Sequence, residues 1–197
     1  MAVPNNLETV LAHNNGTFIA AQANAAGVSN ERLRLLMKAG ELEKVSFGVY
    51  IAPEAFEDKL YTTQLRRKKI IYSHETALYL HDLSDRDSIK YTVTVPTGYN
   101  TTRLREDGFR VFYIKRELHN IGAVRILTMF GNYVTVYNME RTICDCMRSR
   151  NQIDIAIITD ALKRYVRKKD KNINSLMRLA EVFQVTKPLR TYMEVLL

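Results

Sequence analysis

The chain contains no tryptophan and has only two cysteines, four prolines and eight glycines among its 197 residues. Two cysteines cannot build a framework of several disulfides, which excludes the small disulfide-stabilised folds of secreted proteins. No run approaches the roughly 20 apolar residues that a membrane-spanning helix needs. The first nine residues lack the basic start and the apolar run of a signal peptide. We therefore expect a cytoplasmic protein that makes no contact with a membrane.

The two cysteines, Cys144 and Cys146, lie within a segment of helical periodicity. Thiols at this spacing on a helix are poorly placed for a mutual disulfide. Two sulfur ligands are also too few for a zinc site. We expect reduced, partly buried thiols, and neither a metal nor a cofactor.

Catalytic signatures are lacking as well. The four histidines have no metal-ligand spacing, and the chain has no phosphate-binding Walker loop, dinucleotide-binding glycine turn or nucleophile elbow. The dipeptide His81-Asp82 is used by metal phosphohydrolases, but the further His and Asp ligands that they need are not evident. We expect His74 and His81 to be structural or interfacial, and the protein not to be an enzyme.

What the chain has in excess is positive charge, with a formal net charge of +8. This charge favours a polyanionic partner. It is unevenly distributed, because residues 1–51 carry four basic and four acidic side chains. Residues 59–197 carry 25 basic and 14 acidic side chains, a net of +11. The excess therefore lies outside the segment that most resembles a DNA-reading domain.

The first fifty residues predict three short helices followed by a hairpin. A helix is expected from Asn5 or Asn6, and Thr17 and Ser29 are the expected N-caps of the next two. The predicted segments are residues 5–13, 18–26 and 30–39 for the helices and residues 41–52 for the hairpin. Gly27 supplies the tight turn between the second and third helices. This order is that of a winged helix-turn-helix.

The rest of the chain predicts a second, larger domain. Helical segments are expected at 54–69 and 74–80, the latter capped by Ser73. Period-two alternation predicts strands at 89–95, 109–114, 123–130 and 133–137, and helical periodicity follows from Asn138 onward. We predict an α+β fold: a winged helix-turn-helix over residues 1–53, a connecting helical segment over 54–88, and an α+β domain over 89–197. This last domain is expected to have a small, mostly antiparallel sheet and a C-terminal helical bundle.

The third helix is the candidate recognition helix. Helical periodicity places Leu33 and Leu36 on one face and Arg34 and Lys38 on the opposite face. Arginine can pair with guanine in the major groove, and lysine neutralises phosphate. The predicted DNA contacts, including those of the helix start and the wing, are Ser29, Asn30, Arg32, Arg34, Lys38, Lys44, Ser46 and Tyr50. A solvated charged face is the alternative.

Two further basic clusters are candidate contacts to phosphate or to a partner. Their members are Arg66, Arg67, Lys68, Lys69, Lys163, Arg164, Arg167 and Lys168. On the long helix, the four-residue spacing creates two rows of like charge, which repel unless something negative meets them. The sequence does not distinguish three roles for these clusters: binding DNA, binding an acidic protein surface, or forming a solvated surface.

Several segments together resemble one known family. The winged motif "GTFIAAQANAAGVSNERLRLLMKAGELEKVSFGVYIAP" is followed by "YSHETALYLHDL", by the strand "YTVTVP" and by "VTVYNMERTICDCMR". In this order they resemble the AbiEi family, the antitoxins of type IV toxin–antitoxin pairs in bacterial abortive-infection phage defence. The most family-like pieces are "GVY" at residues 48–50, "SHETAL" at 73–78 and "ERT" at 140–142. The resemblance covers essentially the whole chain.

The resemblance implies two activities. The winged domain would bind inverted repeats in double-stranded promoter DNA and repress its own operon. The C-terminal domain would counteract a nucleotidyltransferase toxin encoded beside it, and in type IV pairs no stable complex between antitoxin and toxin is expected. Two alternatives remain: a DNA-binding regulator whose second domain senses a small ligand, and a nucleic-acid-processing enzyme.

Overall fold

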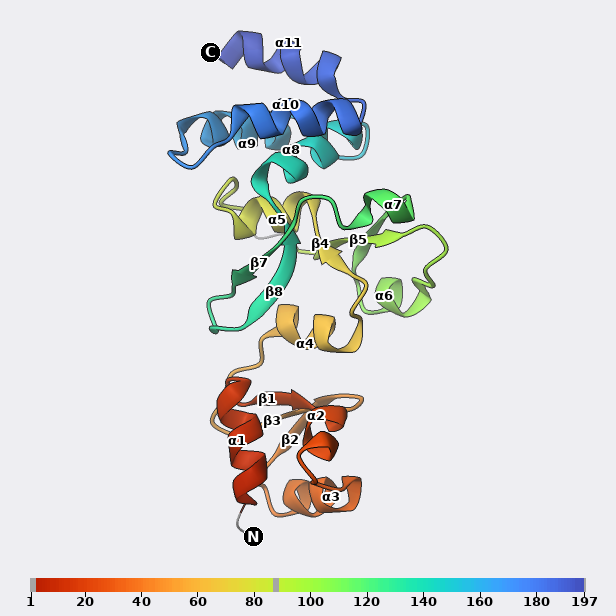
Figure 1. Ribbon diagram of the computed structural model, residues 1–197, viewed down its shortest axis with the longest axis vertical. Coiled ribbons are helices and arrows are strands. Elements are labelled where there is room, and N and C mark those ends of the chain that lie inside the picture. Colours follow the sequence, from red (N-terminus) through yellow and green to blue (C-terminus); the bar gives the residue numbers. More distant parts are fainter. Residues whose placement is uncertain (1–2, 87–88, 197) are drawn as a thin grey trace. The chain divides into compact units, whose positions relative to one another are not determined.

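The computed structural model describes residues 3–86 and 89–196 (Figure 1). The chain forms two compact units, Met1–Lys68 with Ile126–Val134, and Lys69–Arg125 with Thr135–Leu197. The predicted boundary at residue 53 therefore lies inside the first unit. Within this unit the buried carboxylate of Asp58 accepts hydrogen bonds from the amide of Tyr61 (3.0 Å) and the side chains of Asn132 (3.0 Å) and Thr128 (2.5 Å), which ties the segment after residue 53 to residues 126–134.

The first unit has the element order of a winged helix-turn-helix. Its elements are α1 (Asn5–His13), β1 (Thr17–Ile19), α2 (Ala20–Ala25), α3 (Asn30–Lys38), β2 (Glu43–Ser46), β3 (Val49–Ile51) and α4 (Lys59–Arg66). The three strands form an antiparallel sheet in the order β1-β3-β2. Its core joins all three helices of the motif to the hairpin, through Leu7, Ala23, Leu33, Leu36 and Tyr50.

Two predicted elements of this unit are wrong in detail. Thr17 was expected to cap a helix, but Thr17 and Phe18 are buried in β1 and pair with Ile51 and Tyr50 of β3. β-Branched and aromatic side chains suit such a half-buried strand. The helix predicted from Glu54 begins only at Lys59, because the Asp58 side chain provides its N-cap.

The second unit combines a five-stranded sheet with helices. Its elements are β4 (Ile71–Tyr72), α5 (His74–Leu80), β5 (Thr92–Pro96), α6 (Thr102–Glu106), β6 (Arg110–Ile114), α7 (Arg116–His119), β7 (Ala123–Leu127), β8 (Tyr133–Tyr137), α8 (Met139–Arg148), α9 (Ile155–Arg167), α10 (Ile173–Val182) and α11 (Thr186–Leu196). The tip of the β7–β8 hairpin belongs to the first unit. The predicted α+β class is confirmed.

The five-stranded sheet is mixed, whereas a mostly antiparallel sheet was predicted. Its order is β6-β5-β4-β8-β7. β4 pairs antiparallel with β5 but parallel with β8, and β5 pairs parallel with β6. The parallel β5–β6 pair is possible because α6 lies in the crossover between these strands. The two-residue strand β4 was too short to be recognised in the sequence.

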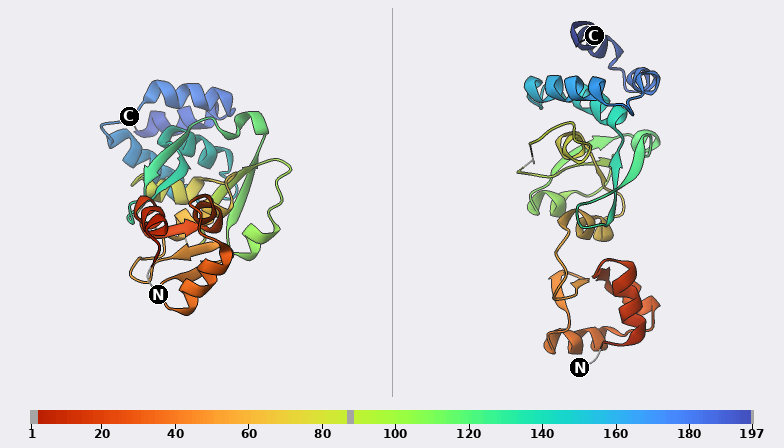
Figure 2. Two further views of the ribbon diagram at one scale, coloured as in Figure 1. Left: turned by 60° about the horizontal axis from the view of Figure 1, so that its bottom comes forward. Right: turned by 90° about the vertical axis from the view of Figure 1, so that its left-hand side faces the viewer.

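The C-terminal helices α8 to α11 stack on one another beside this sheet, as Figures 1 and 2 show. Their common core contains Leu162, Tyr165, Leu176, Leu179 and Leu189, all buried. α8 also packs on α5, which connects the helical layer to the sheet. In the part of the chain that the structure describes, none of the helices combines the length and the apolar character of a membrane span.

Candidate nucleic-acid interface and a buried polar network

α3 has the two faces that its periodicity predicts. Leu33 and Leu36 are fully buried in the core of the first unit, and Arg34 and Lys38 are exposed. The side chain of Ser29 caps the helix by accepting a hydrogen bond from the Arg32 amide (3.2 Å). Ser29 and Asn30 are exposed, so the start of the helix is open to solvent. A charged helix face on a compact scaffold is the arrangement by which helix-turn-helix proteins read a major groove.

Arg34 is engaged within its own helix. Its Nη2 donates to Oε1 of Glu31 at 2.7 Å, and this bond holds the pKa of the Glu31 carboxyl below its ordinary value. Both side chains are more than half exposed. Exposed pairs contribute little to stability and exchange readily. The Arg34 guanidinium can therefore exchange the Glu31 carboxylate for another anion, such as a phosphate.

The wing differs from the sequence prediction at two residues. Lys44 is exposed, as a phosphate contact requires. Tyr50, however, is only 9% exposed and stacks on Phe18 with ring centroids 5.6 Å apart. The hydroxyl of Ser46 is buried. In this fold neither side chain is available to DNA, because Tyr50 packs in the core and the Ser46 hydroxyl is covered. Sequence reasoning missed the exposed aromatic Phe47.

The two basic rows of α9 are not equivalent. Arg164 donates to both carboxylate oxygens of Asp85 (2.7 and 2.5 Å) and to Asp160 (3.0 Å). Lys168 lies 3.6 Å from Asp82. Both side chains of this row thus have carboxylate partners, and their contact with a phosphate or a partner stays a prediction.

The other predicted basic residues are more open. Lys163 and Arg167, the second row of α9, are exposed. In the earlier cluster Arg66, Lys68 and Lys69 are exposed and Arg67 is half-buried. This cluster is divided between the units, since the first ends at Lys68 and the second begins at Lys69.

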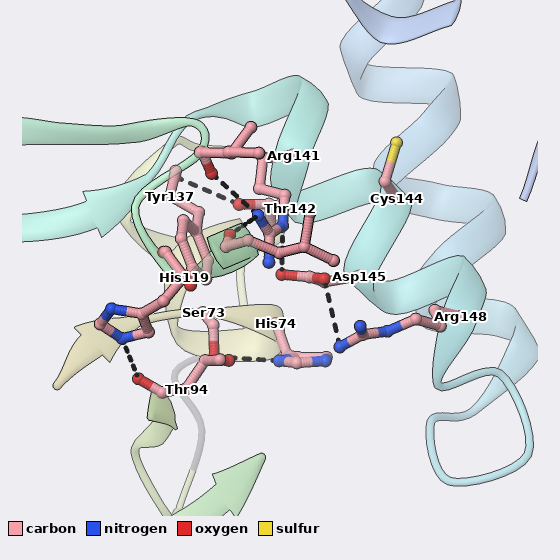
Figure 3. A network of polar contacts seen from close by, with 12 residues as sticks. Ser73, His74, Thr94, His119, Tyr137, Arg141, Thr142, Cys144, Asp145 and Arg148 are labelled. Atoms are coloured by element: carbon pink, nitrogen blue, oxygen red, sulfur yellow. Dashed lines mark hydrogen bonds and ion pairs between the residues drawn. The ribbon is translucent and has the colours of Figure 1, made fainter. Parts of the chain in front are cut away.

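A network of buried polar side chains joins the helices of the second unit to its sheet (Figure 3). At its centre is Arg141 of α8, which is fully buried. Its Nε donates to Asp145 (2.9 Å), and its Nη1 donates to the carbonyls of Leu118 (3.0 Å) and Ile121 (2.8 Å). Figure 3 also shows Asp145 reaching Arg148, with 3.5 Å between the charged atoms.

The Arg141 guanidinium is further enclosed by aromatic rings. It lies 4.1 Å from the ring centroid of Tyr137 and 3.8 Å from that of Phe183. These contacts connect the end of β8 with the end of α10. Burial raises the pKa of the Asp145 carboxyl, and the two neighbouring guanidiniums oppose this shift. An uncompensated charge at this position would be costly, so each partner depends on the other.

His74 forms the other part of the network. Its Nδ1 lies 2.9 Å from the Ser73 hydroxyl, its Nε2 lies 3.1 Å from the Ser149 hydroxyl, and its ring stacks on Phe112 at 3.6 Å. Its backbone has a φ of +47°, which non-glycine residues rarely adopt. Burial lowers the pKa of His74 well below its ordinary value, and the nearby guanidiniums add to this effect. The imidazole is therefore neutral near pH 7.

The network explains two of the sequence segments that carried the family resemblance. Ser73 and His74 come from "SHETAL", and Arg141 from "ERT". Glu140 does not pair with Arg141 but accepts hydrogen bonds from the Tyr165 hydroxyl (2.9 Å) and the Asn172 amide (3.2 Å). These residues hold helices together, which is a structural role. Ser73 does not cap α5 as predicted, because its hydroxyl contacts His74 and Thr94.

The two cysteine thiols lie in the hydrophobic core of the second unit. Both cysteines are fully buried rather than partly, and burial raises the pKa of Cys144 to about 12, so its thiol is not activated. Among the described residues, no group of three or more His, Cys, Asp or Glu side chains is placed to hold a metal ion.

The neutral state of His74 predicts a pH dependence of stability. Unfolding raises the His74 pKa to its ordinary value of about 6.5, so the unfolded chain binds more protons below that pH. Stability should therefore fall as the pH drops below 6.5, by at most about 1.4 kcal/mol per pH unit from this residue. Urea denaturation at several pH values between 5 and 8 measures the free energy of unfolding and its pH dependence.

The comparison variant is His74→Asn, because asparagine tolerates a left-handed backbone. It should flatten the pH dependence relative to the wild type. Burial also lowers the pKa of His81, so part of the slope will remain. His13→Asn at an exposed position is the matched control. Equal slopes for wild type and His74→Asn would contradict the prediction.

No family model matches the chain, and no curated protein is significantly similar to it. A solved structure shares its fold. The crystal structure of the RV2827C protein from Mycobacterium tuberculosis aligns with a TM-score of 0.58, over 91% of this chain and 72% of that chain. The two sequences are 14% identical. A likeness at this identity concerns the fold alone.

Proposed function

We propose that the protein is a cytoplasmic antitoxin of a type IV toxin–antitoxin pair that represses its own promoter. The observation that carries the DNA-binding part is the exposed face of α3, with Arg34 and Lys38 opposite the buried Leu33 and Leu36. The wing beside it adds the exposed Lys44. We infer that α3 enters the major groove of inverted repeats in promoter DNA, and that Lys44 contacts the backbone.

The distribution of charge indicates that the first unit by itself would bind DNA only weakly. The first unit carries eight basic and seven acidic side chains, and the second carries 21 and 14. A nearly neutral reading unit gives little non-specific affinity. Paired molecules on repeated half-sites, or phosphate contacts from exposed cations such as Lys163 and Arg167, would add the missing affinity.

The antitoxin part of the proposal is supported by the resemblance to the AbiEi family. Four residues of that resemblance in the second unit, Ser73, His74, Arg141 and Thr142, belong to its buried network. The proposed partner is a nucleotidyltransferase toxin, antagonised without a stable complex as part of phage defence. No metal or cofactor is required of the antitoxin itself.

Two experiments test the two parts separately. An electrophoretic shift with the DNA upstream of its own gene tests repression. Co-expression with the product of the neighbouring gene tests antitoxicity, by the recovery of growth. Point substitutions are preferable to removal of residues 1–52. That deletion would leave α4 and the β7–β8 tip without the remainder of the first unit, to which they belong. Failure to bind the upstream DNA would reject the repressor, and failure to restore growth would reject the antitoxin.

The Glu31–Arg34 pair predicts a substitution that strengthens DNA binding. Glu31→Gln should raise affinity for the upstream DNA several-fold, because it frees Arg34 and removes a negative charge facing phosphates. Titration by fluorescence anisotropy measures this. Glu194→Gln, at an exposed position of the second unit, is the charge-matched control. A weaker Glu31→Gln complex would show that Glu31 positions Arg34 instead of competing for it.

A further inference from the structure

The tip of the β2–β3 hairpin presents an aromatic ring to solvent. Phe47 is 84% exposed, and the Nζ of Lys44 lies 5.6 Å from its ring centroid. Phe47 and Gly48 form the two-residue turn between the paired residues Ser46 and Val49. Gly48 has a φ of +72°, which allows the turn to close. Phe47 is therefore the outermost large side chain of the wing.

Neither the turn nor the core accounts for a phenylalanine here. Two-residue hairpin loops favour asparagine, aspartate and glycine. The ring buries little of its surface within the first unit, so it adds little to folding. A side chain that breaks local rules without a structural gain points to a contact made in a complex.

The wing is fixed relative to α3. Leu42, just before β2, and Tyr50 of β3 share one buried core with Leu33 and Leu36 of α3. The register shifts between Lys44 and Ser46; the Ser46 hydroxyl is buried, whereas Lys44 is exposed. Lys44 and Phe47 are therefore held at a fixed position relative to α3.

We propose that Phe47 is an apolar wedge that enters the minor groove beside the major-groove site of α3, while Lys44 contacts a flanking phosphate. The inference rests on the proposed DNA-binding function and adds a recognition element to it. Apolar side chains inserted between base steps unstack them partially and kink the duplex. Pyrimidine–purine steps deform most easily, so such a step is the preferred contact. The cation next to the ring favours a polyanion over an apolar protein pocket.

The probe is a duplex of the region upstream of the protein's own gene. Phe47→Ala in the full chain should weaken its binding about tenfold, the typical effect of losing one aromatic contact to a base. Phe47→Leu should retain most of the affinity, because leucine also serves as a wedge. A circular-permutation assay should show a bend for the wild type and Phe47→Leu that is reduced for Phe47→Ala.

Salt dependence separates the roles of the two residues. Lys44→Ala should lower the slope of log affinity against log salt by about one, as expected for one lost phosphate contact. Phe47→Ala should leave the slope unchanged. Because Phe47 is exposed, the thermal unfolding curve of Phe47→Ala should match that of the wild type. A reduced melting temperature with unchanged binding would assign the ring to folding and overturn the proposal.

The remaining outcomes distinguish this inference from the proposed function. If Phe47→Ala binds and bends DNA like the wild type while Arg34→Ala with Lys38→Ala does not bind, the wedge is wrong and the repressor stands. If the wild type does not bind the duplex, both fail. If Phe47→Ala loses only the ability to counteract the toxin, the ring contacts protein, which also overturns the wedge.

Discussion

Arg141→Leu is expected to destabilise the second unit by roughly 3–5 kcal/mol, the usual cost of removing one partner of a buried ion pair. The substitution leaves the Asp145 carboxylate buried without its 2.9 Å partner. It also removes the guanidinium donor of the Leu118 and Ile121 carbonyls, although the Leu118 carbonyl keeps a 3.4 Å bond from the Ile121 amide. Urea denaturation followed by far-ultraviolet circular dichroism measures the loss. Under conditions where the wild type is marginal, the variant should accumulate as unfolded protein.

Two further variants separate charge from packing. Arg178→Leu, at an exposed position of α10, is the matched control and should change stability by less than about 0.5 kcal/mol. The double variant Arg141→Leu with Asp145→Leu should recover part of the loss, because it removes the orphaned charge. Asp145→Leu alone should be as damaging as Arg141→Leu. A change below about 1 kcal/mol for Arg141→Leu would show that the network does not hold the unit together.

Arg34→Ala combined with Lys38→Ala is expected to weaken binding to the upstream promoter DNA about a hundredfold or more. A bidentate arginine–guanine contact contributes about 1–3 kcal/mol of discrimination, and one lost phosphate contact weakens binding further. Both residues lie on the exposed face of α3, so the fold should be unaffected. Fluorescence anisotropy with the specific duplex and a scrambled duplex measures the two components.

The control for net charge is Lys187→Ala with Arg190→Ala, which removes two exposed cations of the second unit. It should lower affinity for both duplexes by the same, smaller factor. The α3 variant should instead lose the preference for the specific duplex. Retained preference in the α3 variant would place sequence recognition elsewhere and reject α3 as the recognition helix.

Local patterns predicted the elements that depend on local chemistry. The α3 helix, its Ser29 cap and its division into a buried and a charged face follow from the residues alone, because capping and helical period act within a few positions. The β8 strand is also found where alternation predicts it, at Tyr133–Tyr137. The short strands β1 and β4 were missed, because two or three residues carry no period and their pairing partners lie far along the chain.

The candidate contacts were predicted only in part for the same reason. Whether Tyr50 or Phe47 faces solvent depends on the register of the hairpin and on a shift within it, which nearby residues do not reveal. Likewise, the sequence predicts Arg164 as a cation available to a partner, whereas in the fold it binds Asp85, which lies 79 residues away in the chain. Long-range contacts of this kind have no signature in a local window.

The amino-acid sequence by itself determined the class of the fold and the charged face of α3, because the apolar period and the caps act between near neighbours. Tertiary structure alone decided how "SHETAL" and "ERT" are used. It brings Ser73, His74 and Arg141 into one buried network, in which Arg141 donates to the carbonyls of Leu118 and Ile121 and His74 lies 3.1 Å from the Ser149 hydroxyl. Burial is a property of the assembled chain, and it is burial that makes Arg141 a structural residue instead of a surface cation.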